Sequence, residues 1–153
     1  MSIDEIIDFV TGLGGVLACR PAPGDGSPEI SWGDTFFYYA PDGQVPTTTQ
    51  PFATIVTKDY PGDERSRLNR PDTFRLNVFA GKDAFTARMG ARPRDAGTLD
   101  TDPSVPDRIV AHPVYGTLGW LCVVNPGPGT VADVRALLVQ AHTSALTRYR
   151  PPR

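Results

Sequence analysis

The stretch HPVYGTLGWLCVVNPGPGT, residues 112–130, decides how the fold ends. It opens with turn residues, continues through the apolar run 119–124, and closes with a Pro/Gly turn at 125–129. Because the run is apolar on both faces, it predicts a central strand that is covered on both sides. Thr130 then stands where a helix N-cap is expected, just before a long amphipathic segment.

Helices are predicted at both ends of the chain. Ser2 and Glu5 form a capping box at the start of an N-terminal helix, which glycines at 12, 14 and 15 end. In the C-terminal segment, apolar residues recur at helical spacing and predict one buried stripe. The stripe comprises Val131, Val134, Leu137, Leu138, Ala141, Ala145 and Tyr149.

Between these helices the pattern predicts strands, with a short helix at 82–89 and a helical turn near 64–68. The strands are expected at 16–20, 35–40, 52–58, 73–80 and 109–111. In 73–80, Arg75 and Asn77 alternate with apolar residues and should face away from them. This order favours an α+β fold, an antiparallel sheet with the N- and C-terminal helices packed on one face. We expect a single domain over 1–149 and a frayed tail over 150–153.

Composition narrows the class of protein. The chain has 153 residues, 40% hydrophobic and 21% charged, as in a soluble globular domain. A net charge of −2 argues against a partner bound through phosphates, such as nucleic acid. The apolar runs are too short to span a membrane, and the acidic start MSIDEIIDF is unlike a secretion signal, so we expect a cytoplasmic protein. Cys19 and Cys122 lie in apolar segments and are expected to be buried thiols.

The densest group of basic and amide side chains indicates a binding surface on the sheet face that the helices leave uncovered. We place Arg75 and Asn77 at its centre, because their strand directs them to that face. The expected contributors are Lys58, Arg67, Asn69 and His112. Such a surface would bind a small anionic ligand or a protein partner, and Arg75→Ala would then weaken binding without unfolding the protein. The alternative is a solvated face paired with nearby aspartates and glutamates.

A second hypothesis is a small enzyme acting on an anionic, phosphorylated or carboxylate substrate. Gly127, Gly129 and Thr130 join a strand to a helix N-terminus, where free amides and the helix dipole favour an anion. His112 would be the acid or base. For this turn, however, an ordinary turn followed by a helix N-cap is the favoured interpretation, because two prolines remove amide donors. No P-loop lysine, nucleophile elbow or metal-ligand spacing is present. We therefore expect no metal or cofactor, and favour a binding or regulatory module without catalysis.

Four segments carry a resemblance to a known family: PEISWGDTFFYY (28–39), FATIVTKD (52–59), RLNRPDTFRLNVFAGKDAF (67–85) and residues 112–130. Over nearly its whole length the chain resembles an uncharacterised actinobacterial family known only as a domain of unknown function. Through Ser31-Trp32-Gly33 before an early strand and Trp120 in the last, it is also similar to the MmcQ/YjbR-like group. That similarity implies a CyaY-like two-layer fold and, as suggested for some YjbR-like proteins, weak DNA binding.

Overall fold

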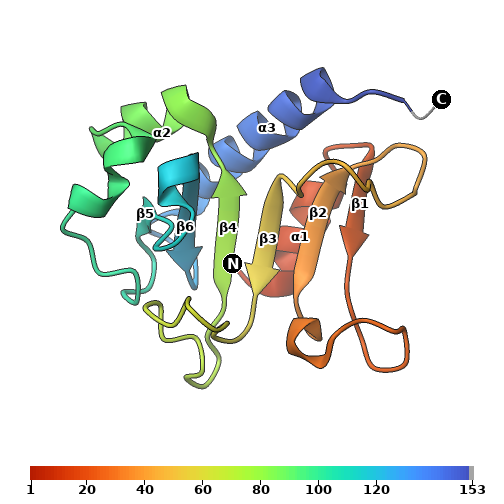
Figure 1. Ribbon diagram of the computed structural model, residues 1–153, viewed down its shortest axis with the longest axis horizontal. Helices are drawn as coiled ribbons and strands as arrows, with labels where there is room; N and C mark the ends of the chain where they lie inside the picture. The colour runs from red at the N-terminus through yellow and green to blue at the C-terminus, as the bar shows by residue number, and fades with distance from the viewer. Residues whose placement is uncertain (152–153) are drawn as a thin grey trace.

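A six-stranded antiparallel sheet forms the centre of the protein (Figure 1); the computed structural model describes residues 1–151. The strands are β1 (Val16–Cys19), β2 (Thr35–Tyr39), β3 (Ala53–Val56), β4 (Arg75–Phe79), β5 (Ile109–Ala111) and β6 (Trp120–Val124). Their order across the sheet is β1-β2-β3-β4-β6-β5. The last strand in sequence therefore lies between β4 and β5, in the interior position that its apolar pattern predicts.

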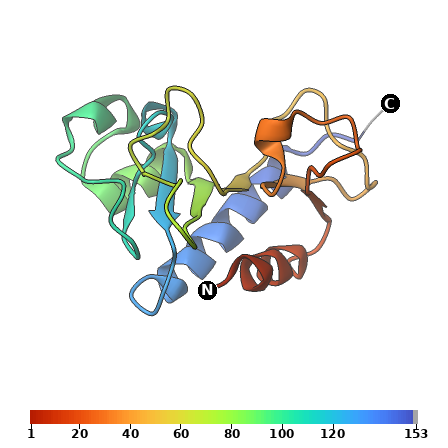
Figure 2. The same ribbon diagram turned by 90° about the horizontal axis from the view of Figure 1, so that it is seen from below.

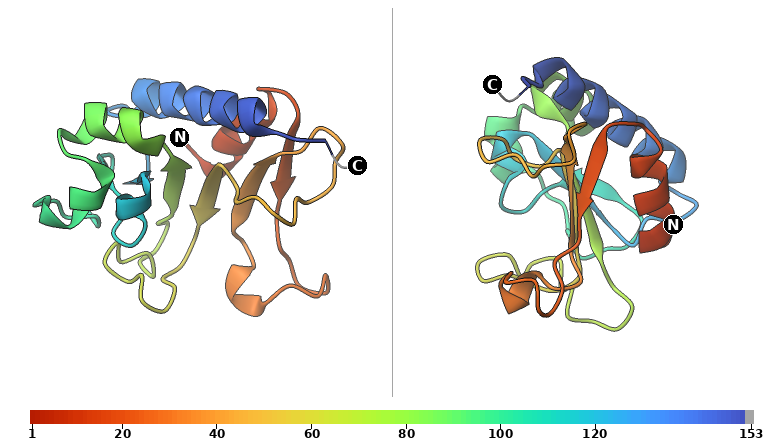
Figure 3. Two further views of the ribbon diagram at one scale, coloured as in Figure 1. Left: turned by 45° about the horizontal axis from the view of Figure 1, so that its top comes forward. Right: turned by 90° about the vertical axis from the view of Figure 1, so that its right-hand side faces the viewer.

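Both terminal helices cover the same face of this sheet (Figures 2 and 3). They are α1 (Ile3–Thr11) and α3 (Val131–Arg148); the short α2 (Gly81–Met89) follows β4 and packs through Phe85 against β5 and β6. Three short 3-10 helices complete the elements, at Glu29–Ser31, Pro93–Thr98 and Gly116–Leu118. The predicted α+β fold, with its helices on one face of an antiparallel sheet, is confirmed.

The main core fills the space between the sheet and the two terminal helices. The sheet contributes Phe37, Ala53, Ile55, Leu76, Val78 and Val123, and the helices contribute Ile6, Val10, Val134, Leu138 and Ala141. Strand pairing places Leu76 beside Val123 and Asn77 beside Cys122. Since side chains alternate along a strand, Arg75 and Asn77 point to the opposite face, as their spacing predicts.

Some local expectations need correction. The capping box at Ser2 is present, but the hydroxyl of Thr130, the N-cap residue of α3, makes no bond to its own helix. Residues 64–68 form a turn closed by the Arg67 N–H and the Glu64 carbonyl, and no helix. The expected tail 150–153 lies partly outside the described residues.

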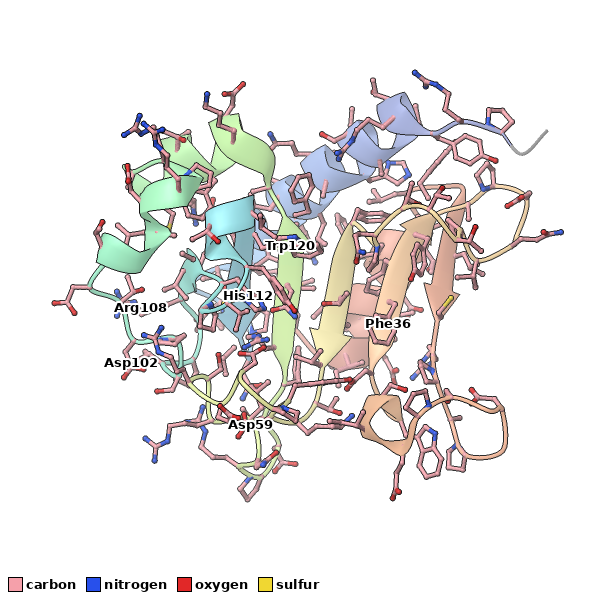
Figure 4. The ribbon with its side chains drawn as sticks, viewed as in Figure 1. Phe36, Asp59, Asp102, Arg108, His112 and Trp120 are labelled. Carbon is pink, nitrogen blue, oxygen red and sulfur yellow. The ribbon has the colours of Figure 1, made fainter. Side chains whose placement is uncertain are left out.

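Loops divide the second face of the sheet into two halves (Figure 4). The segment 57–73 packs over one half, where Leu68 is buried against Val56 and Val124. On the other half, Phe36 of β2 is only half-buried and points away from the helices (Figure 4). The uncovered part of this face is therefore smaller than the helix pattern alone suggests.

Candidate functional site

Arg75 is the centre of a buried ionic cluster. Its side chain leaves β4 on the face away from the helices, and the residue is 1% exposed. Both carboxylate oxygens of Asp63 accept from its guanidinium, Oδ1 from Nη1 at 2.9 Å and Oδ2 from Nη2 at 2.6 Å. Nη1 also donates to Ser66 Oγ, and Nε to Asn77 Oδ1. This bidentate arrangement, in which the guanidinium donates four hydrogen bonds, is one in which a buried charge is tolerated.

His112 extends the cluster and shapes the turn that follows it. Its Nε2 lies 3.1 Å from Arg75 Nη2, and its Nδ1 accepts the backbone N–H groups of Val114 and Tyr115, each at 3.0 Å. Because Nδ1 is an acceptor, the proton of the neutral ring lies on Nε2, and the approach of Nε2 to Arg75 Nη2 is a packing contact between two donors and not a hydrogen bond. Burial, followed by the charge of Arg75, lowers the pKa of His112 to about 3, against the opposing effect of Asp63. The imidazole is therefore neutral at neutral pH.

Asp63 is the anion of the cluster. Burial alone would raise its pKa, but the hydrogen bonds and charge of Arg75, with a smaller effect from His112, together outweigh burial. The pKa of this carboxyl is consequently held below its usual range. Asp63 is thus ionised wherever the protein is folded near neutral pH, and it neutralises Arg75 from within the chain.

Acid is expected to destabilise the protein through His112. Its pKa is near 6.5 when unfolded and about 3 when folded, so the unfolded chain binds the proton first as pH falls. The stability gained from the neutral ring is complete above that unfolded pKa and should fall by about 2 kcal/mol by pH 5. Urea unfolding at several pH values measures this, with His112→Asn as the control that loses the slope. An unchanged slope in that variant would assign the effect to another group, since Asp63 loses its contribution only below pH 3.8.

The structure brings together three of the six residues predicted for the sheet face: Arg75, Asn77 and His112. Asn77 is buried, and its amide donates to Thr54 Oγ1 at 2.9 Å. The other three serve different contacts. Lys58 Nζ donates to Asp34 Oδ1 at 2.8 Å, and Asn69 Oδ1 accepts from the Asp59 N–H. Arg67 is exposed, with a left-handed backbone at φ 56°.

The turn that was expected to bind an external anion is occupied by a carboxylate of the same chain, that of Asp107. The Gly127 and Gly129 amides donate to the two carboxylate oxygens of Asp107, each at 2.9 Å, and Thr130 Oγ1 donates to Oδ1 at 2.6 Å. The Thr130 hydroxyl, then the amides, lower the pKa of Asp107. An external phosphate or carboxylate at this helix N-terminus would therefore have to displace Asp107. The only sequence signal for this contact is an aspartate in the loop before β5.

A groove of about 810 Å³ lies at one end of the sheet, where β2 and β4 end and β3 and β6 begin. The loop 40–51 and the C-terminal turn of α3 complete its walls. Six aromatic residues contribute to the lining: Tyr38, Tyr39, Phe52, Phe79, Trp120 and Tyr149. The Phe79 and Trp120 ring centroids lie 5.7 Å apart, and the Arg148 guanidinium carbon lies 5.1 Å from that of Phe79. Sequence reasoning gave these residues no shared role, because they come from five separate segments of the chain.

A second, smaller cavity of about 110 Å³ lies beside His112. Arg65, Leu99, Thr101, Val114 and Thr117 are among its lining residues. His112 itself is only 4% exposed, and its ring nitrogens face Arg75 and two backbone amides. The cavity has room for a few waters or a very small ligand.

Residues 1–151 were also searched for metal sites and for membrane-spanning helices. Within that range, no group of three or more His, Cys, Asp or Glu side chains is placed to hold a metal ion. Nor does any helix in the described chain combine the length and apolar character needed to cross a bilayer. Cys19 and Cys122 are both free thiols, the first half-buried and the second buried.

Comparison with known proteins identifies the family and no relative of known activity. No curated protein and no solved structure matches the chain. A family model does match, and it covers residues 1–153. This agrees with the resemblance of nearly the whole sequence to a domain of unknown function. The chain belongs to the family of unknown function DUF6194.

Proposed function

We propose that the protein is a binding module without chemistry of its own, and that its ligand is a small molecule with a planar, apolar body held in the aromatic groove. The observation that carries this proposal is the groove itself. Its volume of about 810 Å³ lies in the range of small-molecule sites, and its lining includes six aromatic residues. Trp120 and Phe79 offer a planar ligand two ring faces or edges on which to stack.

The buried cluster supports the groove in this proposal and does not touch the ligand. His112 accepts the Val114 and Tyr115 amides and so fixes the turn that leads into Gly116–Leu118 and Trp120. Leu118, 65% exposed, and Trp120 then line the groove. Arg75 packs against His112, and Asn77 links Arg75 to Thr54 of β3. The role proposed for these residues is therefore positioning, while Lys58, Arg67 and Asn69 have no part in the groove lining.

Two observations favour binding over acid–base catalysis. A histidine with a pKa of about 3 is a weak base at neutral pH, and His112 is almost fully buried. The turn at Gly127–Thr130, the expected substrate anion site, holds Asp107. For DNA binding, proposed through the similarity to YjbR-like proteins, the net charge of −2 gives little support. We further propose a reducing compartment such as the cytoplasm, which the two free thiols suit.

NMR titration with planar probes tests the groove. The probes are 2-naphthamide, adenosine, 2-naphthoate and adenosine monophosphate, followed through the indole N–H signals of the two tryptophans. We expect a saturable shift of the Trp120 signal with at least one probe. Trp120→Ala should weaken that binding by about tenfold, because stacking on an aromatic ring is worth about 1 to 3 kcal/mol.

Trp32→Ala is the matched control, because Trp32 is the only other tryptophan and does not line the groove. It should leave the affinity for the probe unchanged. Circular dichroism establishes that both variants are folded. The proposal fails if none of the four probes gives a saturable shift, or if the two substitutions weaken binding equally.

A further inference from the structure

We infer that the ligand of the groove carries an anionic group, and that Arg148 binds it. This inference rests on the proposed function, because it names the chemistry of the ligand for the same groove. Arg148 is the last residue of α3, and its guanidinium lies over the Phe79 ring at 5.1 Å. The ring contact orients a side chain that would otherwise be free in solvent.

The hydrogen bonds of Arg148 leave its binding edge free. Its Nε donates to the Ser144 carbonyl at 3.3 Å, a contact within α3 itself. Over residues 1–151, Nη1 and Nη2 have neither a hydrogen-bond nor a salt-bridge partner. By contrast, Arg88 of α2 is paired with Asp133 at 2.9 Å. The free fork of Arg148 is the part of a guanidinium that binds carboxylate or phosphate with two parallel hydrogen bonds.

The charge of the groove lining is complementary to an anion. Two arginines, Arg148 and Arg150, face one aspartate, Asp42. Asp42 is engaged locally, because its Oδ1 accepts the Gln44 N–H at 3.1 Å. The cations therefore outnumber the acid in a lining that also contains six aromatic residues. A planar ring with a carboxylate or phosphate at its edge fits both properties.

Two sources share this chemistry, an aromatic carboxylic acid and a nucleoside monophosphate. Each probe used for the groove has a counterpart that differs by the charged group. 2-Naphthoate is paired with 2-naphthamide, and adenosine monophosphate is paired with adenosine. Calorimetric titration of the full chain with all four compounds distinguishes these two ligand classes, because the acid that binds more tightly identifies the class.

We expect the preferred acid to bind about tenfold more tightly than its neutral counterpart, as charge-assisted hydrogen bonds are stronger than neutral ones. Arg148→Gln should abolish this preference, so that the acid and its neutral counterpart bind this variant equally tightly. Arg88→Gln is the control, because Arg88 is a helix arginine outside the groove lining. Added salt should reduce the preference in the wild type.

The outcomes separate this inference from the proposed function. If the acid and its neutral counterpart bind equally well, the inference is overturned and the groove remains a binding site. A preference that survives Arg148→Gln also overturns it, with Arg150→Gln then showing whether the neighbouring cation is responsible. If none of the four compounds binds, the proposed function itself is overturned. Thermal unfolding of Arg148→Gln should match the wild type, because the side chain is exposed.

Discussion

Replacing Arg75 with alanine is expected to lower the free energy of unfolding by about 3 to 5 kcal/mol, the usual cost of removing one partner from a buried ion pair. The substitution leaves Asp63, whose side chain is 14% exposed, without its ionic partner. It also leaves Ser66 and Asn77 each without one hydrogen-bond partner. Single domains are stable by only about 5 to 15 kcal/mol, so this loss is a large fraction of the total. Urea unfolding at neutral pH measures it.

A double-mutant cycle with Asp63→Ala assigns the loss to the pair. Removing both partners should cost much less than the sum of the two single substitutions. Each single substitution leaves one buried charge unpaired, whereas the double substitution leaves none. Arg148→Ala provides the exposed control, and it should change stability by less than about 0.5 kcal/mol. A change below about 1 kcal/mol for Arg75→Ala would mean that solvent reaches the cluster and compensates the loss.

From the sequence alone, Arg75 is expected to contact a ligand, so that its removal would weaken binding without unfolding the protein. The buried cluster leads to the opposite expectation. Alternation along 73–80 correctly places Arg75 and Asn77 on the face away from the helices. Alternation does not say which loops fold over that face. The partners of Arg75 lie 12 residues before it in a loop and 37 residues after it. Such contacts depend on tertiary packing, which local periodicity does not encode.

The fold was more predictable than the site for the same reason. Each element depends on its own residues, as with the capping box at Ser2 or the doubly apolar strand Trp120–Val124. A local pattern can therefore reveal it. The aromatic groove depends on side chains from β2, β4, β6 and α3 meeting at one end of the sheet. Asp107 likewise reaches Gly127 across 20 residues, and only the folded chain brings them together.

Asp34→Ala is expected to destabilise the protein about as much as Arg75→Ala, by about 3 to 5 kcal/mol. Asp34 is fully buried just before β2, and its Oδ1 accepts from the Thr57 N–H, the Thr57 hydroxyl and Lys58 Nζ at 2.9, 2.9 and 2.8 Å. The Tyr60 hydroxyl donates to Oδ2. Burial, then this hydrogen bond to Asp34, raises the pKa of Tyr60, so the phenol remains protonated and continues to donate. Alanine would take this acceptor from the Thr57 N–H and from the Thr57 and Tyr60 hydroxyls, whereas Lys58 Nζ would keep the Trp32 carbonyl. Chemical unfolding measures the cost.

Lys58→Met distinguishes the role of the carboxylate from that of the ion pair. The Lys58 side chain is 26% exposed, and without it Asp34 keeps its bonds from Thr57 and Tyr60. We therefore expect a smaller loss than for Asp34→Ala, because a hydrogen-bonded carboxylate is less costly to bury than the three donors of Thr57 and Tyr60 without an acceptor. Equal losses of unfolding free energy in the two variants would instead show that the charge of Lys58 supplies most of the stabilisation of Asp34. Neither Asp34 nor Lys58 lines the groove, so folded protein of either variant should retain the preference for an acidic ligand. That separation allows a defect in binding to be told apart from a defect in stability.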